Sequence, residues 1–183
     1  AFCRNHALEL SKSQYVAFLD SDDVWFPDKL LKQITFMKQN HYDFTYTNYI
    51  PYKNKRSIDI SNQNSIKPKE KYNFESFIKD TSIATSTMMI NGELARKYKF
   101  TDTKICEDYF YKCSIIKEIG YAYCLNESDT LYRIRKNSLQ SKKFRNLYWI
   151  WKINHRYNKL SFFQNLSSLF NISLNSLKKY GYK

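Results

Sequence analysis

The chain has 183 residues, of which 43% are hydrophobic and 26% are charged, and this length and balance fit one globular domain rather than a disordered polyelectrolyte or a membrane-spanning protein. The formal net charge is +13, and residues 133–183 hold 12 of the 30 basic residues and none of the 17 acidic ones, so a nearly neutral body is followed by a cationic end. The three glycines, Gly92, Gly120 and Gly181, are too scattered for a dinucleotide-binding turn, a P-loop or a G-x-S-x-G nucleophile elbow, which argues against the enzyme classes built on these loops.

The first predicted elements are helix, strand and helix. Residues 4–12 have helical character, and the apolar run at residues 15–19 is typical of a strand buried on both faces. A helix is predicted to open at Pro27, in the favoured first helical position, and to end at Asn40. Its apolar side is predicted to carry Leu30, Ile34 and Met37.

The middle of the chain is predicted to mix strands and helices. Residues 44–50 alternate aromatic residues with Thr or Asn and indicate a strand, whereas the polar residues 51–71 indicate a loop. Residues 83–90 have strand propensity, and residues 107–119 form a good helix with a glycine directly after it. Shorter elements are predicted at residues 93–97 (helix), 121–125 and 130–134 (strands).

The cationic end has an apolar repeat. Residues three or four positions apart are apolar, which predicts an amphipathic helix or a pair of them: Trp149, Ile153, Tyr157, Leu160, Phe163, Leu166, Phe170, Leu174 and Leu177. Lys152, Arg156 and Lys159 form a neighbouring basic stripe. Two interpretations stay open, a helix packed on the body with its basic face in water, or a helix lying on an anionic membrane. Nucleic acid is the least favoured partner.

The cysteines and histidines do not predict a metal centre. The four cysteines form no C-x-x-C pair and the three histidines are far apart in the sequence, so a structural zinc site is not expected. Reduced thiols in a cytosolic protein are the simplest interpretation. The first ten residues, AFCRNHALEL, lack the apolar run of a signal peptide and read like the middle of a domain.

An acidic cluster follows the first predicted strand. Asp20, Asp22 and Asp23 lie within four residues at its carboxyl end, the edge where open α/β sheets bind ligands. Hard divalent cations such as Mg²⁺ and Mn²⁺ take oxygen ligands, and few protein carboxylates are needed when substrate phosphates complete the shell. The cluster therefore predicts a metal–diphosphate site.

Other interpretations of this cluster stay open. One or two of the aspartates could cap the helix beginning at Pro27. A phosphatase of the haloacid-dehalogenase type is a further alternative, because Asp20, Asp22 and Val24 formally meet its D-x-D-x-[TV] motif, and it would make Asp20 a nucleophile. An EF-hand is not expected, since Trp25 stands where its loop requires glycine.

A second acidic pair, Glu107-Asp108, opens a predicted helix. Acids in a first helical turn interact favourably with the helix dipole, so a purely structural role is one interpretation. Together, however, the two clusters supply a carboxylate set for a metal and a separate carboxylate that can accept a proton. These are the minimum for displacing a diphosphate leaving group with a hydroxyl nucleophile.

These motifs, in this order and spacing, resemble family 2 of the glycosyltransferases, which have the GT-A fold. The resemblance covers most of residues 4–145 and rests on Arg4-Asn5, the run at residues 15–25, Pro27-Asp28-Lys29-Leu30, Thr85-Ser86-Thr87, Glu107-Asp108-Tyr109 and Tyr132-Arg133. It implies an α/β fold, a partial GT-A (Rossmann-like) mixed sheet flanked by helices, with C-terminal amphipathic helices.

The resemblance also implies roles for the acids. The chain would be an inverting enzyme that uses a nucleotide-diphospho-sugar donor with Mn²⁺ or Mg²⁺. Asp22 would be the main metal ligand, Asp20 would lie near the ribose and metal, and Asp23 would support them. Asp108 would be the general base that deprotonates the acceptor hydroxyl, and Glu107 would orient it or touch the acceptor.

Three arginines are expected on the donor side. Arg4 stands where family members contact the nucleotide, and Arg133 belongs to the Tyr-Arg pair of the resemblance. Relatives often have a histidine where this chain has Arg135, which could assist the diphosphate as a cation but not as a metal ligand.

The expected organisation is a partial GT-A domain over residues 1–145 and a basic amphipathic tail over residues 146–183. The chain lacks the first strand and the following βα units that hold the nucleobase in the family, so an exposed sheet edge, uncovered apolar surface and impaired donor binding are expected. Family members build bacterial surface polysaccharides on glycan or lipid-linked acceptors at the cytoplasmic face of the membrane, which agrees with a tail that binds an anionic membrane surface. A non-enzymatic membrane-binding module is the remaining alternative.

Overall fold

The computed structural model describes residues 1–53, 64–103, 105–135 and 143–180. Its elements follow in the order α1 (Phe2–Leu10), β1 (Tyr15–Ala17), β2 (Val24–Trp25), α2 (Lys29–Asn40), β3 (Phe44–Thr47), β4 (Ile50–Tyr52), β5 (Lys71–Tyr72), α3 (Phe74–Phe77), the 3₁₀ turn η1 (Thr85–Thr87), β6 (Met89–Asn91), α4 (Gly92–Lys97), α5 (Glu107–Ile119), β7 (Ala122–Leu125), β8 (Thr130–Arg133), α6 (Lys143–Arg156) and α7 (Phe162–Tyr180).

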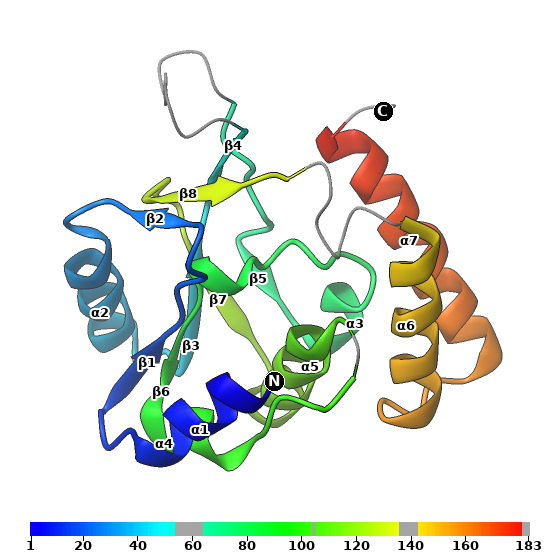
Figure 1. Ribbon diagram of the computed structural model, residues 1–183, viewed down its shortest axis with the longest axis horizontal. Helices are drawn as coiled ribbons and strands as arrows, with labels where there is room; N and C mark the ends of the chain where they lie inside the picture. The colour runs from blue at the N-terminus through cyan, green and yellow to red at the C-terminus, as the bar shows by residue number, and fades with distance from the viewer. Residues whose placement is uncertain (54–63, 104, 136–142, 181–183) are drawn as a thin grey trace.

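The strands form two mixed sheets. The larger has the order β1-β6-β3-β7-β5, with β3 parallel to β7 and antiparallel to β6. The smaller has the order β2-β8-β4, with β8 antiparallel to β2 and parallel to β4. Helix α2 lies on one side of the large sheet, α3 and α5 lie on the other, and α6 and α7 lie beyond them (Figure 1). The predicted mixed α/β fold flanked by helices is confirmed.

Strand β3 is the centre of the large sheet. All four of its residues are buried, as expected for a strand covered on both faces. The single predicted strand at residues 44–50 is wrong, because the chain leaves the large sheet after Thr47 and enters the small one at Ile50. The predicted loop at residues 51–71 contains β4 and β5 near its ends, and its residues 54–63 lie outside the described part of the chain.

Strand β1 is an edge strand. It pairs antiparallel with β6, and its three residues are half-buried, so the prediction of a strand buried on both faces is wrong. Its place in the strand order exposes one side of the backbone ladder. Leu19, Leu10 and Phe2 are 47%, 69% and 81% exposed. The expected sheet edge is therefore present, and the uncovered apolar side chains lie next to it, at Leu19 just after β1 and at Phe2 and Leu10 of α1.

Helix α2 differs from the prediction in its start and its buried side. It begins at Lys29, two residues after Pro27, and ends at Asn40 as predicted. Leu30 is 40% exposed. The buried residues are instead Lys29, Gln33 and Met37. This side of the helix faces polar groups of β3 and η1. A polar side chain can form hydrogen bonds with these groups, whereas a leucine side chain could not.

Helix α5 matches the prediction at both ends, and Gly120 follows it with φ +83°. The strand predicted at residues 83–90 is largely wrong. Residues 85–87 form the turn η1, and β6 starts only at Met89. The turn directs Thr85 and Ser86 toward the acidic residues described below.

The predicted pair of C-terminal helices is confirmed, but they pack differently. Ile150 and Ile153 of α6 belong to the main hydrophobic core. Helix α7 buries Asn165, Ser168 and Ile172. Its predicted apolar side therefore points away from the body, which contradicts simple packing of that side on the core. Among the described residues, neither these helices nor any other is long and apolar enough to cross a membrane.

Candidate active site

The acidic loop between β1 and β2 is held in a tight turn. The Asp23 N–H donates to the Asp20 carbonyl at 2.9 Å. Ser86 of η1 fixes both sides of the turn, because its Oγ accepts from the Asp20 N–H at 3.1 Å and donates to Asp23 Oδ2 at 2.5 Å. The Arg133 N–H donates to Asp23 Oδ1 at 2.8 Å. Burial raises the pKa of Asp23, although these two hydrogen bonds oppose the rise.

The other two aspartates are more accessible than Asp23. The side chains of Asp20 and Asp22 are 35% and 25% exposed, whereas Asp23 is 8% exposed. Asp22 Oδ2 lies 2.8 Å from an Arg135 nitrogen, and Asp20 forms an ion pair with Arg4. Capping of α2 by these acids is wrong, since its N-cap is Asp28, which makes no side-chain cap hydrogen bond.

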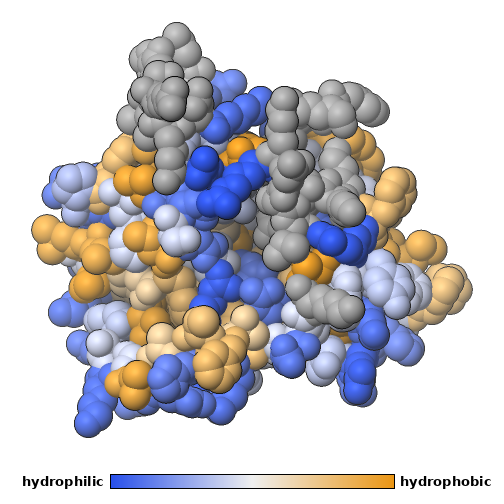
Figure 2. All heavy atoms as spheres, in the orientation of Figure 1, coloured by the Kyte–Doolittle hydropathy of each residue, from blue (hydrophilic) through white to orange (hydrophobic). Residues whose placement is uncertain are grey.

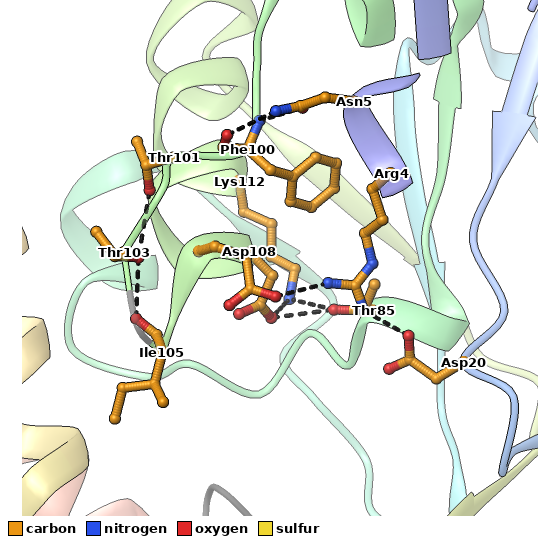
Figure 3. Close-up of polar contacts among 11 residues, drawn as sticks. Arg4, Asn5, Asp20, Thr85, Phe100, Thr101, Thr103, Ile105, Asp108 and Lys112 are labelled. Atoms are coloured by element: carbon orange, nitrogen blue, oxygen red, sulfur yellow. Dashed lines mark hydrogen bonds and ion pairs between the residues drawn. The ribbon is translucent and has the colours of Figure 1, made fainter. Parts of the chain in front are cut away.

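Arg4 connects the two acidic clusters. One of its terminal nitrogens pairs with Asp20, and the other donates to Glu107 Oε1 at 2.8 Å. Figure 3 shows the Arg4 guanidinium between Asp20 on the acidic loop and the start of α5. A helix dipole and a guanidinium both favour negative charge here. The two clusters that the sequence predicts to act together are thus joined through one side chain.

Asp108 lies in a different set of contacts at the same helix end. Its Oδ2 accepts from Lys112 Nζ at 2.7 Å and from Thr85 Oγ1 at 3.0 Å. Burial alone would raise the pKa of Asp108, but the ammonium of Lys112, helped by Thr85 and Arg4, lowers it to about 2. Asp108 is therefore ionised at neutral pH, the state that a proton acceptor needs.

Lys112 is not among the predicted site residues. Its side chain is 3% exposed, and Nζ also donates to the Ile83 carbonyl at 2.7 Å. A lysine four residues after an aspartate on a helix is a recognised pairing distance. This spacing is a signal in the sequence that could have identified it.

A polar network supports η1 from beneath. Trp25 Nε1 donates to the Ser86 carbonyl at 2.6 Å, and Gln33 Nε2 donates to the Thr87 carbonyl at 3.0 Å. Lys29 Nζ donates to Gln33 Oε1 at 2.7 Å and lies 4.3 Å from the centre of the Trp25 ring. Lys29 is fully buried, and burial lowers its pKa to about 8. These residues hold the turn that fixes the acidic loop.

The accessible carboxylates suit a divalent cation shared with phosphates. Within residues 1–53, 64–103, 105–135 and 143–180, no three His, Cys, Asp or Glu side chains form a group able to hold a metal ion. Asp20 and Asp22 nevertheless offer hard oxygen donors at the surface of one turn, and Mg²⁺ commonly uses one or two carboxylates plus substrate phosphates. The residues present therefore fit this kind of site.

Positive charge surrounds the loop on the β8 side. Arg133 Nε is buried and has no hydrogen-bond partner among the described residues, and the Arg135 side chain is 52% exposed. Arg4 also lines a hollow of about 270 Å³ with Leu8, Val16 and Leu19 between α1 and β1. The acids thus lie next to donors suited to phosphate oxygens.

Comparison with known proteins gives consistent matches. The family model described as Glycosyl transferase family 2 matches residues 3–99. The putative teichuronic acid biosynthesis glycosyltransferase TuaG of Bacillus subtilis is 31% identical over 180 residues, covering 98% of this chain and 70% of TuaG. The Escherichia coli protein WfgD, a UDP-Glc:alpha-D-GlcNAc-diphosphoundecaprenol beta-1,3-glucosyltransferase, is 31% identical over 162 residues, covering 84% of this chain and 58% of WfgD.

Solved structures share the fold. Staphylococcus aureus TarS residues 1–349, in complex with UDP-GlcNAc, superposes with a TM-score of 0.58 and 15% sequence identity. The match covers 95% of this chain and 52% of the TarS chain. The chain therefore spans about half the length of this solved structure.

Proposed function

The chain belongs to glycosyltransferase family 2, and from that membership we propose that it transfers a sugar from a nucleotide-diphospho-sugar to an acceptor hydroxyl, with inversion at the anomeric carbon, in surface-polysaccharide synthesis. The family sets aside the phosphatase alternative with Asp20 as nucleophile. The observation that carries the proposal is the double contact of Arg4, which joins the acidic loop to the start of α5.

On the donor side, Asp22 and Asp20 would hold Mn²⁺ or Mg²⁺, and Asp23 keeps their loop in place. The cation, when bound, neutralises charge on the departing diphosphate. Arg133 and Arg135 lie on the same side and would contact diphosphate oxygens, as the unpaired Arg133 Nε supports. Since Arg135 pairs with Asp22, donor binding requires this ion pair to rearrange.

On the acceptor side, Asp108 would take the proton from the attacking hydroxyl. The new bond forms between the acceptor oxygen and the anomeric carbon, while the bond from that carbon to the diphosphate breaks and the nucleotide leaves with the electron pair. Lys112 and Thr85 both donate to Oδ2 of Asp108, so we assign the proton to Oδ1. Glu107, held by Arg4, would orient the acceptor.

We propose a glycan or lipid-linked acceptor at the cytoplasmic face of a membrane, with the protein bound there peripherally. The similar protein WfgD is a glucosyltransferase named for a diphosphoundecaprenol-linked sugar, and the excess of basic residues at the end of this chain suits a surface with anionic lipid.

The test compares donor binding with transfer in three variants. Asp22→Asn should weaken Mn²⁺-dependent binding of a UDP-sugar about tenfold or more, because a charged metal ligand is lost. Asp108→Asn should leave that binding unchanged and slow transfer by about a hundredfold or more. Asp28→Asn, at an exposed residue next to the site, is the matched control. Equal loss of binding and transfer in Asp108→Asn would contradict its role as a base.

A further inference from the structure

Helix α7 is amphipathic with its polar side turned inward. Ser168 Oγ donates to the Ile78 carbonyl at 2.5 Å, and Asn165 Nδ2 donates to the Trp151 carbonyl at 3.0 Å. In α6, the Nδ2 atom of Asn154 donates to Asn165 Oδ1 at 3.2 Å and to Ser168 Oγ at 3.1 Å. Each hydrogen bond needs a specific partner, so this network determines which side of α7 meets the body.

The opposite side of α7 is a continuous apolar stripe. Phe163, Leu166, Phe170 and Leu174 are 80%, 52%, 64% and 40% exposed, and they recur at the three- and four-residue spacing of one helix face. Phe162, the first residue of the helix, extends the stripe, and its ring centre lies 5.5 Å from that of Trp151. Figure 2 shows hydrophobic side chains along the α7 side of the molecule. Exposed apolar surface of this extent indicates an interaction site.

Exposed basic residues lie near both ends of α7. Lys152, Arg156 and Lys159 near the α6–α7 turn and Lys178 near the other end are exposed. Lys179, in contrast, turns inward and pairs with Asp80 at 2.6 Å. No acidic residue occurs in the sequence from 133 to 183. The partner of this face must therefore accept apolar side chains and carry negative charge.

We propose that the outer face of α7, the stripe of Phe162, Phe163, Leu166, Phe170 and Leu174, docks flat on a bilayer that contains anionic lipid. This inference deepens the proposed function by naming the face that meets the membrane. A nucleic acid would meet basic residues along the face itself, whereas here the exposed face is formed by phenylalanine and leucine and the basic residues lie near the ends of α7. A second copy would bring the same positive charge against itself.

The dimensions agree with a helix lying in the interface. From Phe163 to Leu174 the stripe runs about 16 Å along the axis, at 1.5 Å per residue. This is about half the thickness of a hydrocarbon core. The side chains can thus enter the boundary between head groups and acyl chains while the polar inner side keeps its hydrogen bonds to the body.

The experiment is co-sedimentation of the full 183-residue chain with vesicles. One set is phosphatidylcholine alone and the other contains about a third phosphatidylglycerol. The wild type should bind the anionic vesicles more tightly, and high salt should weaken the binding. Phe163→Ser with Phe170→Ser should lower the partition coefficient about tenfold or more. Lys152→Gln with Arg156→Gln should lower it on anionic vesicles only.

Matched controls come from α2. Leu31→Ser removes an apolar side chain that is 69% exposed outside the stripe, and Lys38→Gln removes an exposed charge; both should bind as wild type. Phe163→Leu should retain binding, and circular dichroism should show that every variant is folded. Absence of vesicle binding, or equal binding by the double serine variant, overturns the inference. The inference is also overturned if light scattering shows that the wild type self-associates and that the double serine variant abolishes this self-association while still binding vesicles. None of these measurements requires sugar transfer, so a failure of the membrane inference can be distinguished from a failure of the proposed transferase activity.

Discussion

The ion pair between Lys112 and Asp108 allows a quantitative test of how the candidate base is held. The lysine side chain is 3% exposed and the aspartate side chain 22% exposed, with 2.7 Å between Nζ and Oδ2. A pKa lowered from 3.8 to about 2 corresponds to about 2.5 kcal/mol in favour of the ionised form, at 1.36 kcal/mol per pKa unit. Removing only Lys112 leaves a carboxylate whose burial is no longer offset, and breaking such a pair costs about 3–5 kcal/mol.

A double-mutant cycle isolates the pair. Free energies of unfolding in urea are measured at pH 7 for the wild type, Lys112→Met, Asp108→Asn and the double variant. The lowered pKa is the net effect of burial, Lys112, Thr85 and Arg4, so for the pair alone we expect a coupling energy of about 1–3 kcal/mol, within the range for residues in contact. Because the pKa of Asp108 is lowered by folding, this stabilisation is present above pH 3.8 and is lost as the pH falls toward 2.

The exposed pair of Lys99 and Glu9 is the control. Their side chains are 69% and 56% exposed, with 2.9 Å between Nζ and Oε1, so water and salt screen the pair and its coupling should be much smaller. Additive effects of Lys112→Met and Asp108→Asn, or a coupling no larger than that of the control cycle, would refute the electrostatic account of Asp108.

Two further predictions concern stability. Lys29→Met should remove a pH dependence: the wild-type lysine, with its pKa lowered by burial to about 8, loses its proton in the folded state before the unfolded state does. The contribution of Lys29 to the free energy of unfolding should therefore rise by about 3 kcal/mol between pH 8 and 10.5. Urea denaturation of the wild type and of Lys29→Met across that pH range should show the rise in the wild type alone. Gly92→Ala should lower the melting temperature markedly, because its Cβ would lie 2.0 Å from the Ser13 carbonyl oxygen. Gly120→Ala is the control: its Cβ would meet open space at φ +83°, so the free energy of unfolding should fall by only about 1 kcal/mol. An equal loss of stability in both variants would show that the backbone at Ser13 moves aside at little cost.

Local signals in the sequence predicted several elements well. Helix α5 has good helix formers, acids in its first turn and a glycine after its last, and all of these act within a few residues. The periodicity of α7 was equally visible, but a period identifies a face without saying what it meets. The inward side proved to be Asn165 and Ser168, because partners from Ile78, Trp151 and Asn154 become known only when the chain is folded. The strand at residues 44–50 failed for a similar reason, since its split depends on two different sheets.

In the candidate site, too, local features could be predicted from the sequence and contacts between distant residues could not. The acids at 20–23 and 107–108 could be predicted together, because carboxylates after a strand and at a helix start carry their chemistry in the sequence. The link through Arg4 is a contact across 103 positions to Glu107, which neither a local signal nor the resemblance, with Arg4 expected at the nucleotide, predicted. Ser86 and Trp25 support the loop across more than 60 positions, and their roles depend on the turn η1 that strand propensity concealed.

Tyr109 follows Asp108 directly in α5, and its hydroxyl donates to Asn154 Oδ1 of α6 at 2.8 Å. The same amide holds α7, so three helices share one buried junction. If α6 and α7 tilt, they must either move α5 with them or break this junction. A search for mutants with altered turnover should therefore include Asn154, although it touches neither of the two acidic clusters.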